Sequence, residues 1–370
     1  MAEVLHFQGF IKNVTYRAFL ANSLEKTDLV SFDVNKSKAF GSIESSHTEI
    51  AYSKWVSPKR TRSYPFARIY NTYNASKIIT IIPVIKDGDR DRIQYSTISW
   101  MNLLNIYIVL AFYETAEKSN KKGQQNKHKL TNQQFNNEFV KAQIQEILAY
   151  KQSALHWNKN LFETRFTTIF ERALNCYDLI SKQTEVLIHS RRGMNQYLNS
   201  IVEEFEEFKN ISLKGSQSAS KREALTSHKL EYLVDGLKAT FSIENYLGGV
   251  YYLTPDEIFH SNDVYIIQES KNTSQGLLPK ISDIQDGLFK LILFSNLDSL
   301  TLDGQTVSFI CKLKLTGKNI INYLILPDRS AKLNSFITEN AFNENQKNTI
   351  HLLDLEAKNN NFIIEISSNT

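Results

Sequence analysis

Hydrophobic and polar positions divide this chain into three regions with different patterns. Residues 1–118 carry short runs of β-forming residues, including two strongly apolar segments at Lys77–Ile85 and Asn105–Phe112. Such runs predict strands. The sequence therefore predicts an N-terminal β-rich region, followed at 119–134 by a polar segment without periodicity that is typical of a linker.

In the middle of the chain, from Phe135 to about residue 209, apolar residues recur at intervals of three and four, which predicts long helices. We expect a helical subdomain or connector over residues 131–212 and a second polar linker at 214–223. The apolar marker positions of the three expected helices are Phe135, Phe139, Ile144, Ile147 and Leu148; then Leu161, Phe162, Phe166, Ile169, Phe170, Leu174, Tyr177 and Ile180; then Ile201, Phe205 and Phe208.

The last region, 228–370, mixes both patterns. A helix-like segment, Ile281–Phe294, stands among strand-like runs. The whole chain is therefore expected to adopt an α/β fold of the mixed α+β kind, in three regions. The strand-like runs are Gly249–Leu253, Val264–Glu269, Val307–Leu315, Ile320–Leu326 and Phe362–Ile366.

Composition narrows the class of protein. A length of 370 residues favours two domains, and 42% hydrophobic with 22% charged residues is typical of a globular chain. The net charge of +4 permits binding to a polyanion without requiring it. Two distant cysteines exclude a disulfide framework and match no zinc spacing. The sequence shows no secretory signal, apolar stretch of bilayer length or P-loop, so we expect a cytoplasmic protein without membrane association.

Two strand-like runs of the last region end in charged residues. The first leads into Pro255-Asp256, and the second, Val264–Ile267, continues into Gln268-Glu269-Ser270-Lys271. Residues i and i+2 of a strand share a face, so Glu269 and Lys271 are predicted to project together. The twelve intervening residues suit a hairpin that returns Asp256 to a position beside Glu269.

Two carboxylates at the ends of adjacent strands suit Mg²⁺, which prefers oxygen ligands and keeps several waters. In this hypothesis Asp256, Glu269 and the backbone carbonyl of Ser270 hold the ion. The ion polarises a phosphoryl oxygen and lowers the pKa of a bound water. Lys271 orients that water or stabilises charge in the transition state.

Pro255-Asp256, the twelve-residue interval and Glu269-Ser270-Lys271 together resemble the PD-(D/E)xK nuclease superfamily, in particular type II restriction endonucleases. The resemblance covers about a quarter of the chain. It implies an α-β-β-β-α-β core, Mg²⁺-dependent cleavage that leaves 5′-phosphates, and frequent dimerisation. The neighbouring elements fit that order, with a strand-like Ala239–Ile243 before the acid, and with the helix Ile281–Phe294 and the strand Val307–Leu315 after the lysine.

The spacing alone leaves other interpretations open. Glu269 and Lys271 can form an exposed ion pair at a strand end, with Asp256 in an ordinary turn. Asp263 is a second candidate for the metal-binding acid, but it would start the strand that carries Glu269 and lie roughly 20 Å from it. Glu244 is either a third carboxylate of the site or a solvated acid at a strand end.

Further charged residues follow in the helix and in the next strand. Asp283, Asp286 and Lys290 fall on neighbouring helical turns. Lys290 is a candidate for phosphate contact, and the alternative is a solvent-facing row of ion pairs. Lys312 and Lys314 alternate with leucines, which is typical of the exposed face of a half-buried strand, with phosphate contact as the alternative.

Candidate DNA contacts lie outside this region. A basic segment at 53–73 is rich in aromatic residues and contains two prolines, which favours a loop. Arginine suits guanine edges and lysine suits phosphates, whereas a surface loop with structural aromatics is the alternative. A second basic pair, Arg191 and Arg192, follows a predicted helix. We expect it either to bind phosphate or to complement the charge at the helix C-terminus. The candidate nucleic-acid-binding residues are Lys59, Arg60, Arg62, Arg68, Arg191 and Arg192.

The segment KDGDRDRIQ at 86–94 brings Asp87, Asp89 and Asp91 close together in sequence. These carboxylates could bind a second metal ion. The simpler interpretation is a salt-bridged turn in which the neighbouring arginines pair with the aspartates.

From these patterns we expect a type II restriction endonuclease. Residues 228–370 would cut double-stranded DNA with Mg²⁺, and the N-terminal region, 1–118, and the helical region, 131–212, would contribute recognition and dimer contacts. Expected partners are double-stranded DNA, a second copy of the chain and a cognate DNA methyltransferase. The alternatives are a non-catalytic nucleic-acid-binding protein, and a defence or repair nuclease that acts on another nucleic acid.

Overall fold

The computed structural model describes residues 4–45, 48–54, 66–84, 95–120, 130–186, 237–245, 250–328 and 330–369, with a few positions between 192 and 199. It is a mixed α/β structure, which confirms the predicted class. Two compact units divide it. Unit 1 comprises residues 1–23, 65–74 and 215–370, and unit 2 comprises residues 24–64 and 75–214.

These units do not coincide with the three regions expected from the pattern along the chain, 1–118, 131–212 and 228–370. The reason is a long-range strand pairing. β1 (Val4–Phe10) pairs in parallel with β9 (Lys238–Glu244) and antiparallel with β13 (Ser299–Leu302), so the start of the chain belongs to the unit formed by its last third.

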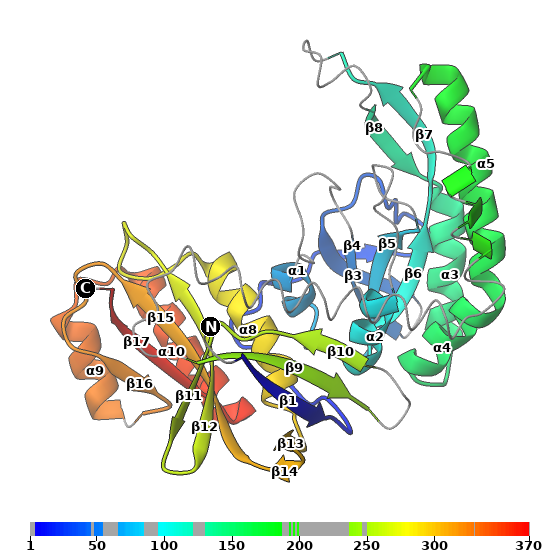
Figure 1. Cartoon of the computed structure of the whole chain (residues 1–370). Coiled ribbons are helices and arrows are strands. Elements are labelled where there is room, and N and C mark those ends of the chain that lie inside the picture. Colours follow the sequence, from blue (N-terminus) through cyan, green and yellow to red (C-terminus); the bar gives the residue numbers. More distant parts are fainter. Residues whose placement is uncertain are drawn as a thin grey trace. The chain divides into compact units, whose positions relative to one another are not determined.

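Unit 1 contains two five-stranded sheets (Figure 1). The first has the order β10-β9-β1-β13-β14, with β10 at Val250–Leu253 and β14 at Gln305–Thr306. The second has the order β11-β12-β15-β17-β16. In it β12, β15 and β17 run parallel, and β11 and β16 are antiparallel edge strands. The strands of this second sheet are β11 (Glu257–Ser261), β12 (Val264–Asn272), β15 (Ser308–Gly317), β16 (Leu324–Leu326) and β17 (Ile363–Ser368).

The helix α8 (Ile281–Phe294) has the bounds predicted from the apolar pattern. It contacts β12 and β15 of the second sheet, and Phe294 packs edge-on against Phe241 of β9 in the first sheet. Because α8 touches both sheets, its apolar residues are buried on several sides, and it is the central helix of unit 1. The other helices of the unit are α1 (Phe66–Tyr70), α9 (Ser330–Glu339) and α10 (Glu344–Asn360).

A buried carboxylate on α10 ties the N-terminal segment to this unit. Glu356 Oε1 accepts hydrogen bonds from the hydroxyls of Tyr16 and Tyr70, both at 2.7 Å. Its Oε2 accepts from the backbone N–H groups of Phe19 at 2.5 Å and Leu20 at 3.1 Å. Burial raises the pKa of Glu356, while these four donors lower it. Each buried oxygen therefore has the partners that burial of a polar group requires.

Unit 2 is built on a five-stranded sheet with the order β2-β3-β4-β5-β6. The neighbours β4, β5 and β6 are parallel, and every residue of β5 is buried, as expected for a strand covered on both faces. A two-stranded sheet, β7-β8, extends the unit (Figure 1). The strands are β2 (Lys26–Asp28), β3 (Phe40–Ser45), β4 (Thr48–Lys54), β5 (Ile78–Pro83), β6 (Tyr107–Ala111), β7 (Tyr113–Lys118) and β8 (Leu130–Phe135).

The prediction of a linker at 119–134 is wrong for its last residues, which form a strand. β8 pairs antiparallel with β7 there, and Tyr113 and Phe135 stack at 4.6 Å between ring centroids. Polar side chains on an exposed strand hide the periodicity that would reveal it. The first predicted helix is present as α3 (Asn137–Ala149), although its first marker, Phe135, lies in β8, and the second is present as the π-helical turn η2 (Leu161–Arg165) and α5 (Phe166–Thr184). The helices α2 (Tyr95–Leu103) and α4 (Ala154–Asn160) were not predicted. The third predicted helix, around Phe205, lies outside the described residues.

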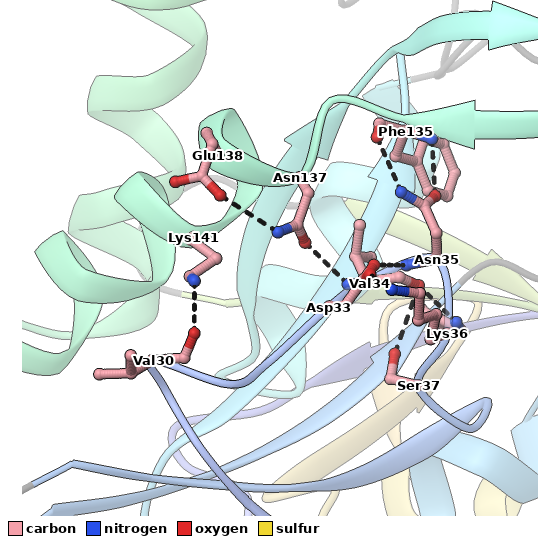
Figure 2. Close-up of polar contacts among 11 residues, drawn as sticks. Val30, Asp33, Val34, Asn35, Lys36, Ser37, Phe135, Asn137, Glu138 and Lys141 are labelled. Carbon is pink, nitrogen blue, oxygen red and sulfur yellow. Dashed lines mark hydrogen bonds and ion pairs between the residues drawn. The ribbon is translucent and has the colours of Figure 1, made fainter.

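Side-chain amides fasten the loop after β2 to β8 and α3 (Figure 2). Asn35 exchanges two hydrogen bonds with the backbone of Phe135, at 2.9 and 2.7 Å, and Asn137 Oδ1 accepts from the N–H of Val34 at 2.9 Å. The buried ammonium of Lys54, on β4, donates to the carbonyl of Val34 at 2.5 Å. Burial lowers the pKa of Lys54 to about 8. These polar contacts hold the loop in place, and because they involve no apolar periodicity, the sequence pattern does not reveal them.

No helix in the described part of the chain is both long and apolar enough to cross a bilayer.

Candidate active site

A tight hairpin in unit 1 brings the first carboxylate to the second. Asn262 and Asp263 form its two-residue turn, both with positive φ (51° and 61°), a conformation that favours Asn and Asp. The resulting register pairs Glu257 with Gln268. Asp256 therefore lies beside the end of β12, where its Oδ2 accepts a hydrogen bond from the backbone N–H of Ser270 at 2.8 Å.

The second carboxylate is fully buried. Glu269 is 0% exposed and lies on the face of β12 that packs against α8. Lys290, from α8, places its ammonium 3.1 Å from Glu269 Oε1 and 3.0 Å from Oε2. The same ammonium lies 3.8 Å from Asp256 Oδ1. One lysine therefore lies between the two carboxyl groups.

Burial and charge shift the two carboxyls in opposite directions. Burial raises the pKa of Glu269 to about 8; Lys290 opposes that shift, and the nearby charge of Asp256 adds to it. Burial also acts to raise the pKa of Asp256, but Lys290, Lys271 and the N–H of Ser270 together lower it. Without a metal ion, the pair is therefore a neutral acid beside an ionised one at neutral pH. Carboxyls held this close do not ionise together.

Lys271 reaches the same place from β12. Its side chain runs over Gly287 of α8, where a Cβ atom would lie 3.3 Å from Lys271 Cε and 2.8 Å from Leu313 Cδ1. Its charge lowers the pKa of Asp256 and of Glu269, although it forms no ion pair with either among the described residues. Glycine at 287 provides the space for this lysine between the helix and the sheet.

Asp286, the neighbour of Gly287 on α8, extends the charged group. Its Oδ1 accepts a hydrogen bond from the backbone N–H of Ala67, at the start of α1, at 2.8 Å. Burial raises the pKa of Asp286, while that hydrogen bond and the charge of Lys271 lower it. The three acids and two lysines together leave a single net negative charge when all are ionised.

The pair of carboxylates is compatible with a Mg²⁺ ion. In the described part of the chain, no three His, Cys, Asp or Glu side chains gather closely enough to form a metal cage. Mg²⁺ needs only one or two carboxylates, because it keeps several waters. Glu269 Oε2 is buried and accepts no hydrogen bond from the described residues, although Lys290 Nζ is near it. The Lys290 ammonium already lies between the oxygens of the two carboxyl groups, so this position suits a cation.

The structure thus brings together Asp256, Glu269, Lys271 and Lys290, and it separates other candidates from them. Asp263 is exposed in the hairpin turn. Glu244 is exposed at the end of β9, where its backbone carbonyl accepts from the N–H of Ile11 at 2.9 Å.

Ser270 contributes its N–H to Asp256, and its hydroxyl accepts from Gln268 at 3.1 Å on the opposite face of the sheet. Lys312 and Lys314 also lie on that opposite face, in register with Gln268 and Ser270. Lys312 forms an ion pair with Glu365 of β17 at 2.8 Å. These two lysines therefore do not contribute to the carboxylate site.

Two of the six predicted DNA-contact residues lie in the described part of the chain. Arg68 is half-buried in α1, and Arg192 is exposed in a short helical stretch. The remaining candidates for nucleic-acid or second-metal binding lie outside the described residues: Lys59, Arg60, Arg62, Arg191, Asp87, Asp89 and Asp91.

Lys290 lies closer to the two carboxyl groups than the sequence pattern indicated. The interpretation of Asp283, Asp286 and Lys290 as a solvent-facing row of ion pairs is wrong for Lys290. Its side chain is only 16% exposed and turns inward toward Glu269. Its position inside the apolar run Gly287–Phe294 was a usable signal, because a lysine surrounded by core residues needs a buried partner. Lys238 is a second residue that the sequence did not reveal. It is buried on β9 and donates to the carbonyl of Asp256 at 3.0 Å.

No protein-family model, curated protein or solved structure matches this chain.

Proposed function

We propose that this protein is a Mg²⁺-dependent endonuclease that hydrolyses phosphodiester bonds of double-stranded DNA, of the type II restriction kind. The observation that carries this proposal is the meeting of Asp256, Glu269 and Lys271 at one place, with the two acids next to each other. The PD-(D/E)xK resemblance requires these residue types together.

Each side chain has a role in this chemistry. Bound Mg²⁺ would activate a water and neutralise charge on the phosphate. Asp256 and Glu269 would hold the ion, and the N–H of Ser270 and the ammonium of Lys238 fix the segment that carries Asp256. Lys271, without a carboxylate partner of its own among the described residues, is available to stabilise the charge that develops on the phosphoryl oxygens.

The order of the surrounding elements supports the same proposal. The bridge between Leu237 and Ile258 connects the region of β9 to β11. From there the chain forms the β11–β12 hairpin, then α8, and then β15 parallel to β12. With β10, β13 and β14 as additional strands between them, a strand, a hairpin, a helix and a parallel strand follow in this order, which resembles the α-β-β-β-α-β core expected for the superfamily. In this arrangement the β11–β12 hairpin positions the two carboxylates, and α8 packs against the side chain of Lys271.

The test is cleavage of mixed-sequence duplex DNA with Mg²⁺ by the full chain and by three variants, Asp256→Asn, Glu269→Gln and Lys271→Met. We expect discrete fragments with 5′-phosphate ends from the wild type and a loss of about 100-fold or more in each variant, as for removal of a group that stabilises a transition state. Glu365→Gln is the matched control, because it removes a carboxylate that pairs with a lysine on the opposite face of the same sheet.

Cleavage that persists in Glu269→Gln at the wild-type rate would refute the proposed site. Salt-dependent DNA binding by a wild type that never cuts would instead favour the non-catalytic binding protein. Under the proposal, a specific cutter requires a cognate DNA methyltransferase for protection of the host. A palindromic target would require a homodimer, since two-fold symmetric DNA is matched by two copies of one site.

A further inference from the structure

We propose that Lys290 is a tethered cation that occupies the metal position between Asp256 and Glu269, and that it must move away before a divalent ion binds. This inference rests on the proposed function and adds a regulatory element to it. A metal ion and the Lys290 ammonium in its present position would exclude each other, so the chain itself would set the Mg²⁺ concentration at which the site fills.

The Lys290 ammonium faces the same carboxyl oxygens that a metal ion would bind. Asp256 uses Oδ2 for the N–H of Ser270, so Oδ1 is the oxygen that faces Lys290 and the neighbouring acid. Lys290 Nζ lies 3.0–3.1 Å from both oxygens of Glu269. An ion that bridges the two carboxylates would bind the same oxygens at about 2.0–2.1 Å. Two cations cannot share that space.

Among the groups at this site, the Lys290 side chain is the one that can move. Leu288, Phe289 and Leu291 are completely buried, so the backbone of α8 is held by the core. The Lys290 side chain is 16% exposed, whereas Glu269 is 0% exposed. A lysine has a long flexible stem that can carry its ammonium toward solvent. The lysine side chain is therefore the part that can leave, and the carboxylates remain in place for the metal.

A competing internal cation weakens metal binding in a predictable way. Only the fraction of molecules with Lys290 withdrawn can accept the ion, and the apparent dissociation constant is the intrinsic one divided by that fraction. A withdrawn fraction of about one in ten would weaken binding about tenfold. Removing the ammonium should therefore tighten metal binding, which is the opposite of what loss of a stabilising side chain usually does.

The experiment is calorimetric titration of the full chain with Mn²⁺ and with Mg²⁺, comparing wild type, Lys290→Met and Lys312→Met. Lys312 is a close match, because its side chain is 15% exposed and it pairs with a glutamate of the same sheet at 2.8 Å, on the opposite face. We expect Lys290→Met to bind about tenfold more tightly and Lys312→Met to bind like the wild type. Titrations at about pH 8 and about pH 9 separate the ammonium from protons, since over this range the proton on Glu269 is lost, whereas an ordinary lysine, with a pKa of about 10.4, stays mostly charged.

The outcomes distinguish this inference from the proposed function. If the wild type binds metal and cuts DNA, but Lys290→Met binds metal with equal or lower affinity at both pH values, the tethered cation is refuted and the nuclease remains. If neither protein binds metal, both proposals fall. Glu269→Gln should lose metal binding in every case. The thermal stabilisation by saturating Mn²⁺ provides a second readout, and it should be larger for Lys290→Met than for the wild type.

Discussion

Replacing Glu269 with glutamine tests the electrostatics of the site independently of any reaction. Burial raises the pKa of this carboxyl from 4.5 to about 8. The native protein therefore keeps a proton at pH 7 that the unfolded chain releases. Stability linked to such a group is fully present below the unfolded pKa and is lost as the pH rises through the folded one. Glutamine carries no proton to lose, so the variant should escape this loss.

The expected gain follows from the two pKa values. Between 4.5 and pH 7 each pH unit corresponds to about 1.36 kcal/mol, so Glu269→Gln should raise the free energy of unfolding by about 3 kcal/mol at pH 7 in the absence of metal. At pH 5.5 the gain should be less than half of its value at pH 7, and below pH 4 it should vanish. The size of the stability gain at one pH could have several causes, whereas its dependence on pH identifies the protonation of Glu269 as the cause.

Glu365→Gln is the control with the opposite sign. Lys312 and Lys314 lower the pKa of Glu365 against the effect of its burial. Its stabilising contribution is present above the unfolded pKa of 4.5 and is lost as the pH falls through the lowered value. This variant should therefore lose stability at pH 7, by less than about 1 kcal/mol because the ion pair is partly exposed to solvent.

The assay is denaturant-dependent hydrogen exchange of the β12 amides with a chelator present, at several pH values. A chain with two compact units need not unfold in one step, and exchange reports the unit that contains β12. If Glu269→Gln raised the free energy of unfolding equally at pH 5 and pH 7, the prediction that Glu269 is protonated at pH 7 would be refuted. A loss of stability at pH 7 would mean that Glu269 is ionised and stabilised by its ion pair with Lys290.

Two further predictions concern packing. Gly287→Ala should reduce both DNA cleavage and the stability of unit 1, because its Cβ would lie 2.8 Å from Leu313 Cδ1 and 3.3 Å from Lys271 Cε; cleavage equal to that of the wild type would show that the position of this lysine does not matter. Lys77→Met should destabilise unit 2 by about 2 kcal/mol, since the Lys77 ammonium donates to three carbonyls at the C-terminal end of α3. Chemical denaturation measures this loss, and a change below about 0.5 kcal/mol would contradict it.

The local pattern of the sequence predicted α8, β12 and β15 of the candidate site, but it predicted no strand over β11. The bounds of Ile281–Phe294 were predicted from apolar spacing and are those of α8. The alternation in β15 places Leu313 inward and Lys312 on the other face, as predicted. The interval between Asp256 and Glu269 fits the hairpin that joins them, because two antiparallel strands and a two-residue turn use that number of residues.

Only the tertiary structure decided how strongly these charges interact. The sequence does not state that Glu269 is completely buried, that Lys290 turns inward between two acids, or that Gly287 lies under Lys271. It also does not show that β1 completes the sheet of unit 1. Periodicity specifies which face of an element is apolar, but burial and charge coupling depend on which distant element covers that face. The chain thus encoded its strands and helices locally, and the chemistry of its site through long-range packing.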